Sequence, residues 1–343
     1  MALNALHYFW PVLPASMLGD GPKRILLFDE AIVLFRSSGY IQALDDRCPH
    51  RGAPLSEGQI TRDGLQCPYH GWTFNGQGQC TRVPGLTREC PAAKVITPWR
   101  VQEASGFIWL AKEGGGEIIT YTDASTLDSL YFYQQVDASL QDILENFLDG
   151  FHTHFVHAGW IRKDKGRQRV RATRSAKATS AEVVYSEEGK QNGFFSSFLE
   201  SSRGISIGRY LAPMSAEIEY RDTHGNISLI ASLAVSPVSG ELQKPEEQTS
   251  QSGRYGVSLR VATCRYRALP LWLKRVLLSP LIKAVLKQDQ KMIAAVNSNL
   301  SGFSPAPFKP LDTELDLMAP IVRLGLAGEA LNALPDFCVE LEL

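Results

Sequence analysis

The stretch CPHRGAPLSEGQITRDGLQCPYHGW, residues 48–72, contains two short segments that each combine a cysteine with a histidine. One residue separates Cys48 from His50, two residues separate Cys67 from His70, and sixteen residues lie between the two segments. Thiolate and imidazole ligands together suit zinc or an iron–sulfur centre. Each segment also contains a proline and a glycine, which is typical of tight loops, so the stretch predicts two loops that hold a metal centre between them.

The spacing distinguishes zinc from an iron–sulfur centre. A closed zinc site with two cysteines and two histidines usually has longer gaps within each ligand pair, and Cys48 and His50 could share one small tetrahedral ion only awkwardly. The pairing is easier if Cys48 and Cys67 hold one iron of a [2Fe–2S] cluster and His50 and His70 hold the other, which is the Rieske arrangement. The other four cysteines are expected to be small buried hydrophobic residues.

Bulk properties limit the class of protein. The chain has 343 residues, which favours two domains, and a net charge of −1, which argues against nonspecific nucleic-acid binding over the whole surface. No basic segment precedes an apolar run at the start, so we expect no signal peptide. The apolar stretch 269–286 is interrupted by Lys274, Arg275, Pro280 and Lys283, which predicts no transmembrane span. We therefore expect a cytoplasmic protein.

The cluster segments resemble those of a known family. CPHRGAPLSEGQI and CPYHGWTFNGQGQC, together with HYFWPVLPAS near the start and GFIWLAKEG at 106–114, are similar to the Rieske domain of Rieske non-haem iron oxygenases. The resemblance implies an α+β chain with two domains. Residues 1–115 would form a β-rich Rieske [2Fe–2S] domain, and residues 116–343 a helix-grip (START-like) catalytic domain with a curved antiparallel sheet around a long helix.

A second group of histidines lies in LDGFHTHFVHAGW, residues 148–160, within an expected helix over 139–158. At about 100° per residue, His154 and His157 would lie about 60° apart on one helix face, whereas His152 and His157 would lie about 140° apart. Periodicity alone therefore favours His154 and His157 as a pair of metal ligands.

The resemblance favours a different pair. The family pattern D-x-x-H-x-x-x-x-H, preceded by an asparagine, matches Asn146, Asp149, His152 and His157. It implies that His152 and His157 bind a mononuclear Fe(II), with Asn146 nearby but not bound, and that the helix ends or distorts between the two histidines. His154 would then pack beside the site. Asp149 would connect His152 to a Rieske histidine of a neighbouring subunit, which implies a ring-shaped homotrimer.

The third iron ligand must be a carboxylate far along the chain. The family supplies it from a later helix, often within a pair of acidic residues, and here an expected helix over 270–299 contains Gln288 and Asp289. The resemblance implies that Asp289 is the ligand, with Gln288 in the place of the first acid. The alternative is that Asp289 is a solvated surface charge, and the acids of LDTELD, residues 311–316, are weaker candidates for the ligand.

The resemblance also implies the reaction and its partners. A ferredoxin or flavin reductase would deliver electrons from NAD(P)H to the cluster, and iron would use them to activate O2 beside an apolar, ring-containing organic substrate. The short chain looks more like the vanillate O-demethylase and pheophorbide a oxygenase branch, which favours monooxygenation by hydroxylation or oxidative demethylation. The alternatives are a cis-dihydroxylating dioxygenase α subunit and, outside the enzymes, a Rieske electron carrier fused to a ligand-binding domain.

Residues 162–177 form a strongly basic segment with eight basic residues and one acid. Arg167, Arg169 and Arg171 alternate and would share one face of a strand. We expect a solvated edge strand that its charges protect from pairing. Docking of an acidic electron donor and contact with an anionic substrate are the alternatives.

Overall fold

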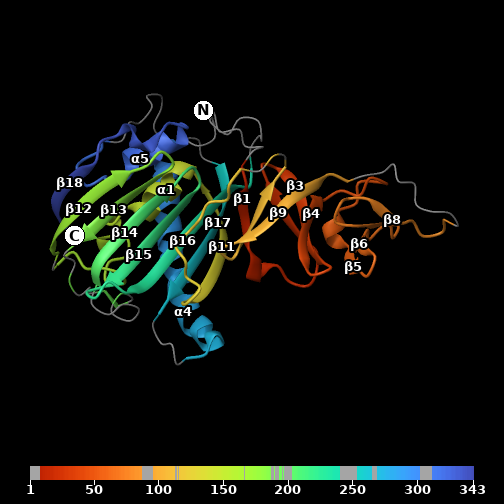
Figure 1. The fold of residues 1–343 in the computed structure, drawn as a ribbon, viewed down its shortest axis with the longest axis horizontal. Helices are drawn as coiled ribbons and strands as arrows, with labels where there is room; N and C mark the ends of the chain where they lie inside the picture. Colours follow the sequence, from red (N-terminus) through yellow and green to blue (C-terminus); the bar gives the residue numbers. More distant parts are fainter. Residues whose placement is uncertain are drawn as a thin grey trace.

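The computed structural model describes residues 8–86, 96–112, 114, 116–165, 167–186, 189, 193, 194, 196, 203–239, 253–264, 269–301 and 311–343. Figure 1 shows an elongated molecule in which the first part of the chain forms a β-rich end and the remainder forms a large sheet with helices. The expected α+β class is confirmed. Residues 113 and 115, at the expected domain boundary, lie outside the described residues.

Two antiparallel sheets form the β-rich end. The larger has the strand order β1-β10-β9-β4-β3-β2, and the smaller has the order β5-β6-β7-β8 and lies toward the tip of the molecule (Figure 1). The strands of the larger sheet are β1 (Trp10–Pro14), β2 (Lys23–Leu27), β3 (Glu30–Ser37), β4 (Tyr40–Asp45), β9 (Pro98–Ala104) and β10 (Phe107–Ala111). Those of the smaller sheet are β5 (Gln59–Thr61), β6 (Gly64–Gln66), β7 (Thr73–Phe74) and β8 (Cys80–Arg82).

Two-residue turns connect several of these strands. Ser38–Gly39 and Ser105–Gly106 have positive φ at both residues, as a type I′ hairpin requires. Phe28–Asp29 has the same geometry, and its two backbone N–H groups donate to the carbonyls of Pro237 (3.2 Å) and Val238 (3.0 Å). These two bonds attach the β-rich end to the end of strand β16 in the large sheet.

The large sheet is antiparallel throughout, with the strand order β11-β17-β16-β15-β14-β13-β12-β18. Its strands are β11 (Asp128–Ala138), β12 (Arg169–Ala176), β13 (Ser180–Ser186), β14 (Arg203–Leu211), β15 (Ser215–Asp222), β16 (Ile227–Pro237), β17 (Gly253–Thr263) and β18 (Phe337–Glu342). Short 3-10 helices occur at Ala15–Met17, Leu55–Glu57, His152–His154 and Leu331–Ala333.

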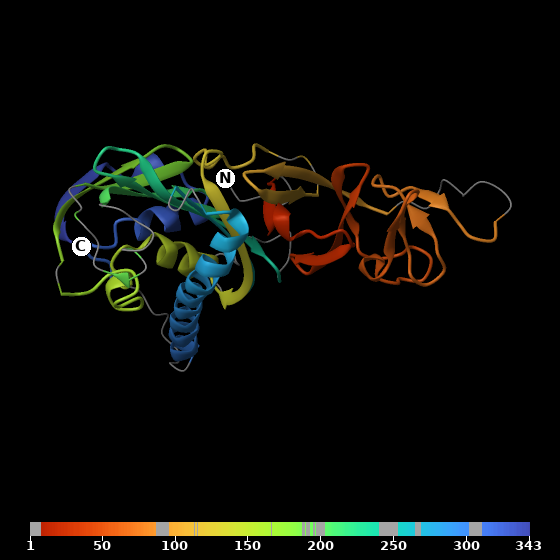
Figure 2. The ribbon, with the colours of Figure 1, turned by 90° about the horizontal axis from the view of Figure 1, so that it is seen from below.

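Three α-helices lie on one face of the large sheet: α1 (Leu140–Leu148), α4 (Leu271–Ser301) and α5 (Ala319–Leu326). Ile143 of α1 and Ile282 of α4 belong to the same buried core as the sheet residues Leu233 and Leu259. Figure 2 shows the sheet arching over the helices, with the C-terminal end of α4 projecting from the body. No helix among the described residues is both long and apolar enough to cross a membrane.

Helix α1 is shorter than expected. Its start is fixed by a capping box between Ser139 and Asp142, but it ends at Leu148, so the expected helix over 139–158 is wrong beyond that residue. The Asp149 carboxylate accepts hydrogen bonds from the backbone N–H groups of Phe151 (2.7 Å) and His152 (3.2 Å). This local turn replaces the helical hydrogen bonds and changes the direction of the chain after Asp149.

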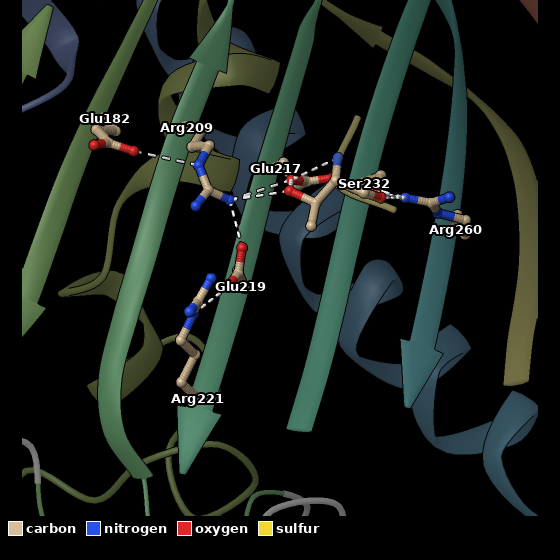
Figure 3. A network of polar contacts seen from close by, with 8 residues as sticks. Glu182, Arg209, Glu217, Glu219, Arg221, Ser232 and Arg260 are labelled. Carbon is tan, nitrogen blue, oxygen red and sulfur yellow. Dashed lines mark hydrogen bonds and ion pairs between the residues drawn. The ribbon is translucent and has the colours of Figure 1, made fainter. Parts of the chain in front are cut away.

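A buried ionic network occupies the opposite face of the sheet (Figure 3). Arg209 Nη1 lies 2.6 Å from a carboxylate oxygen of Glu219 and 3.3 Å from one of Glu217. The second Glu217 oxygen accepts from the Ser232 hydroxyl at 2.9 Å, and the first accepts from Thr122 in the segment that leads to β11. Because both glutamates are fully buried, each depends on these partners to compensate its charge.

The basic strand β12 is not at the sheet edge, so that expectation is wrong. Strand β18 pairs with its outer side and places Glu342 opposite Arg169 and Glu340 opposite Arg171. Opposite charges therefore face each other across the strand pair. Two of the alternating arginines thus have acidic partners within the chain, and their presence does not require an external partner.

Candidate active site

The two cluster loops have the same backbone hydrogen bond. The N–H of Gly52 donates to the carbonyl of Cys48 at 2.8 Å, and the N–H of Gly71 donates to that of Cys67 at 3.2 Å. Both glycines have positive φ, +75° and +69°, which side-chain-bearing residues adopt only at a cost. The two loops thus close in the same way and bring their cysteines and histidines to one end of the β-rich part.

The cysteine and histidine side chains of the two loops differ in exposure. Cys48 and Cys67 are buried, whereas His50 and His70 are exposed, with ring centroids 4.5 Å apart. Trp72 stacks on His50 at 4.8 Å and an interplanar angle of 8°. Burial, with Cys67 adding to it, raises the pKa of the Cys48 thiol to about 11, so only a bound metal would hold it as a thiolate at neutral pH.

The other described cysteines differ from expectation. Cys80 is half-buried and disulfide-bonded, Cys264 is half-buried, and Cys338 is exposed. None is a fully buried hydrophobic residue, so that prediction is wrong for these three. The fourth, Cys90, lies outside the described residues.

A second group of ligands forms where α4 passes the turn after α1. His157 Nε2 lies 2.9 Å from Asp289 Oδ1, and His152 Nε2 lies 3.4 Å from the same oxygen. One ligand atom from each of the three residues lies within 4.8 Å of the other two. Two imidazoles and one carboxylate that converge in this way match the facial triad of non-haem Fe(II) sites.

Hydrogen bonds on the far side of each ring show that a cation fits between the three residues. His152 Nδ1 lies 2.8 Å from the backbone carbonyl of Asp149, which can only accept, so Nδ1 carries the proton and Nε2 presents a lone pair. His157 Nδ1 likewise donates to Gln288 Oε1 at 2.8 Å. With both rings in this tautomer, the buried Asp289 Oδ1 has no hydrogen-bond donor. Two lone pairs and a carboxylate therefore face one another, an arrangement that needs a positive charge between them.

The pKa values of His152 and Asp289 in the metal-free chain also indicate that a positive charge is needed between the three residues. Burial lowers the pKa of His152, but hydrogen bonds and charges from Asp149 and Asp289 outweigh it and raise the pKa to about 9. Burial raises the pKa of Asp289, but its contacts with the two imidazoles outweigh this and lower it well below the usual range. A proton on His152 would thus supply the positive charge that a metal ion would otherwise bring.

Three neighbouring residues have distinct positions. Asn146 lines the cavity beside the three ligands. Asp149 leaves 42% of its side chain exposed, and its Oδ2 lies 3.6 Å from His152 Nδ1. His154 is buried, with Nδ1 3.2 Å from the carbonyl of Phe151, and is not part of the converging group. The structure thus joins His152, not His154, to His157.

The three ligand residues line a cavity of ≈ 170 Å³ between the helices and the large sheet. Its walls are mostly aliphatic and include Ile207 and Leu229 from the sheet and Val285 and Leu286 from α4. A smaller number of polar groups, among them Arg162, Tyr185 and Ser206, interrupt this lining. A pocket of this kind suits an apolar molecule that carries a few polar groups.

Comparison with known proteins identifies the first part of the chain. Residues 9–100 match the family model described as the Rieske [2Fe-2S] domain. The chain carries a Rieske [2Fe–2S] domain. The stretch 48–72 with the predicted cluster loops lies inside the matched range.

Several relatives of this chain are named as oxygenases or demethylases. The chain is 37% identical over 180 residues to pheophorbide a oxygenase from Oryza sativa subsp. japonica, a match that covers 45% of the chain and 34% of the relative. It is 32% identical over 174 residues to methylxanthine N1-demethylase NdmA from Pseudomonas putida, covering 46% and 48%. The chain therefore matches less than half the length of these curated relatives.

Solved structures extend the likeness to the whole fold. Dicamba monooxygenase bound to dicamba superposes with a TM-score of 0.76 at 18% identity and covers 96% of this chain and 98% of its own. NdmA from Pseudomonas putida CBB5 with caffeine gives a TM-score of 0.71 at 20% identity, covering 94% and 90%. The fold of the described chain is therefore similar to the folds of dicamba monooxygenase and NdmA.

Proposed function

We propose that this chain is the oxygenase component of a Rieske non-haem iron monooxygenase that hydroxylates or oxidatively demethylates an apolar, ring-containing substrate. The observation that carries the proposal is the convergence of two histidine lone pairs and the buried Asp289 oxygen in an apolar cavity of a Rieske protein. The demethylating activity named for relatives such as NdmA supports monooxygenation, and a relative named as 3-chlorobenzoate-3,4-dioxygenase makes dihydroxylation the alternative.

Cys48, His50, Cys67 and His70 would hold the [2Fe–2S] cluster, and His152, His157 and Asp289 would hold the mononuclear iron. When bound, the cluster would supply electrons one at a time, and the mononuclear iron would activate O2. The exposed imidazoles of His50 and His70 would form the electron exit, because the two cysteines lie on the buried side. The domains would be residues 1–115 and 116–343.

A homotrimer would connect the two centres. The small β5–β8 sheet lies at one end of the molecule and the large sheet at the other (Figure 1), which favours transfer between chains over transfer within one. Asp149 suits the receiving position because its carboxylate is exposed on one side and contacts His152 on the other. It would accept a hydrogen bond from a histidine of the partner subunit and hold both rings in line, with Asn146 beside it.

Within the cavity, the aliphatic walls would exclude water and orient the substrate ring toward the three ligands. The outward hydrogen bonds of His152 and His157 would keep both Nε2 atoms available to the metal. A ferredoxin or flavin reductase using NAD(P)H would supply the electrons. The cytoplasmic location stays a prediction.

Iron content is the first test. The purified protein should contain one iron more than its cluster requires, and His152→Ala should remove that iron and turnover while leaving the cluster spectrum unchanged. His154→Ala is the matched control and should keep the additional iron. If His154→Ala loses the iron and His152→Ala keeps it, the pair that helical periodicity favours is correct.

A protein with cluster iron alone would be an electron carrier with a ligand-binding domain. For a protein that does turn over, products formed under 18O2 with a reductase and a broad substrate panel define the reaction. One labelled oxygen in a hydroxylated product, or an unlabelled demethylated product released together with formaldehyde, means monooxygenation. Two labelled adjacent hydroxyls mean cis-dihydroxylation and would contradict the proposal.

A further inference from the structure

Two consecutive residues of α4 contact the two nitrogens of one imidazole ring. Asp289 Oδ1 lies 2.9 Å from His157 Nε2, and Gln288 Oε1 lies 2.8 Å from His157 Nδ1. The ring itself is only 1% exposed, so water does not compete for either nitrogen. We propose that Gln288 is a positioning residue that holds His157 in its metal-binding tautomer, an inference that rests on the proposed iron site.

The two histidines depend on different kinds of outer partner. His152 Nδ1 faces a backbone carbonyl, that of Asp149, which no substitution at 149 can remove. His157 Nδ1 faces a side chain, that of Gln288, so its tautomer can be changed by one substitution. If Gln288 were absent, the proton of the neutral ring could move to Nε2 and occupy the position that the metal requires.

The amide also sets the charge of the site. A glutamine accepts the Nδ1 proton but carries no charge, so two neutral imidazoles and one carboxylate would leave Fe(II) with one net positive charge. A glutamate at 288 would accept the same hydrogen bond and add a negative charge beside the ring. Gln288 therefore accepts the hydrogen bond that a glutamate would accept, but it leaves the site less negative than a glutamate would. A less negative site makes the bound iron easier to reduce.

The test compares three variants for binding of Co(II) to protein whose mononuclear iron has been removed and whose cluster is intact. Gln288→Leu keeps the approximate size of the side chain but removes the acceptor. Gln288→Glu restores the acceptor. Lys291→Leu is the control, because Lys291 is an exposed residue of the same helix.

We expect Gln288→Leu to weaken Co(II) binding by about 10- to 100-fold, the range typical of lost outer partners of metal ligands. Gln288→Glu should restore the affinity to within about threefold and, in the iron-loaded protein, lower the midpoint potential of the mononuclear iron. Lys291→Leu should bind Co(II) as tightly as the original chain. The visible d–d bands of bound Co(II) should change in Gln288→Leu alone.

Two results would overturn the inference while leaving the proposed function intact. Gln288→Leu could bind Co(II) as tightly as Lys291→Leu, or Gln288→Glu could fail to restore the affinity that Gln288→Leu loses. If the original chain binds no metal beyond its cluster, both the inference and the proposed iron site are wrong.

Discussion

The two cluster-loop glycines allow a paired test of how tightly the loops are built. Gly52 and Gly71 both have positive φ, but they differ in what an added methyl group would meet. At Gly52 no atom lies within 4 Å of the added carbon, whereas at Gly71 the Cγ of Pro84 lies at 3.0 Å. Substitution by alanine at the two positions therefore separates backbone strain from steric contact.

The magnitudes follow from this difference. A left-handed backbone costs an L-residue about 1–2 kcal/mol, and the reduced freedom of the unfolded chain offsets about 0.4–1 kcal/mol of that. Gly52→Ala should therefore lower the free energy of unfolding by about 1 kcal/mol. Gly71→Ala has the same cost and must also displace the Pro84 ring, so we expect a total of about 2–3 kcal/mol, taking the typical cost of overpacking as a guide.

Urea denaturation, followed by tryptophan fluorescence and by the visible absorbance of the cluster, measures both effects. Equal losses for Gly52→Ala and Gly71→Ala would refute the reasoning from the Pro84 contact. A loss below about 0.3 kcal/mol at Gly52 would refute the reasoning from φ.

Three further predictions concern other parts of the chain. Glu217→Ala removes the acidic partner that lies 3.7 Å from buried Arg260 and should cost about 3–5 kcal/mol in urea denaturation; Glu217→Gln should cost less. In the metal-free protein the pKa of His152 is raised from 6.5 to about 9, so the stability that its partners provide is present below pH 6.5 and should be lost as pH rises to 9. Calorimetry at several pH values checks this, and constant stability across that window would contradict it. Asp149→Asn should slow oxidation of the reduced cluster by O2 and substrate about 10- to 100-fold in stopped-flow measurements while iron content is kept.

The cluster loops could be predicted from sequence because all their information is local. Cysteine, histidine, proline and glycine lie within a few residues of one another in each loop, and the positive φ at Gly52 and Gly71 is a property that glycine signals by itself. The position of the two loops relative to each other follows from short hairpins. Little of this part depends on contacts between residues far apart in the chain.

The histidine pair is harder to predict from sequence, because the helix ends within the segment that contains the histidines. An α-helix that continued beyond Leu148 would favour His154 as the partner of His157. In the structure the helix ends at Leu148, and His154 is buried beside the site. The dipeptide Asp149–Gly150 is a local turn signal that predicts the end of the helix there. Given that signal, periodicity beyond Leu148 no longer decides which histidines share a face.

Long-range pairing could not be predicted from local pattern. The pairing of β18 with β12 joins segments more than 150 residues apart, and only the match of Glu340 and Glu342 to Arg171 and Arg169 hints at it. The contact between Gln288 and His157 has no local signal at all. It depends on where α4 passes the turn that follows α1.

That position is set by contacts between α4 and β11. Lys274, buried near the helix start, bonds to Asp128 at the strand start, and Gln290 donates to the carbonyl of Gln135. The 16 residues from 274 to 290 rise about 24 Å along a helix, and the 7 residues from 128 to 135 extend about 23 Å along a strand. Helix and strand therefore run in register between these two contacts.

This match explains how a ligand so distant in sequence reaches the histidines. A shift of α4 by one residue would rotate its side chains by about 100° and move them by about 1.5 Å, enough to take Asp289 away from His157. Asn297 adds a third contact, 3.5 Å from the carbonyl of Asp137, so loss of one contact leaves two that hold the register. The geometry of the iron site thus depends on polar contacts along β11 that touch no ligand, and substitutions there should weaken metal binding only when two are combined.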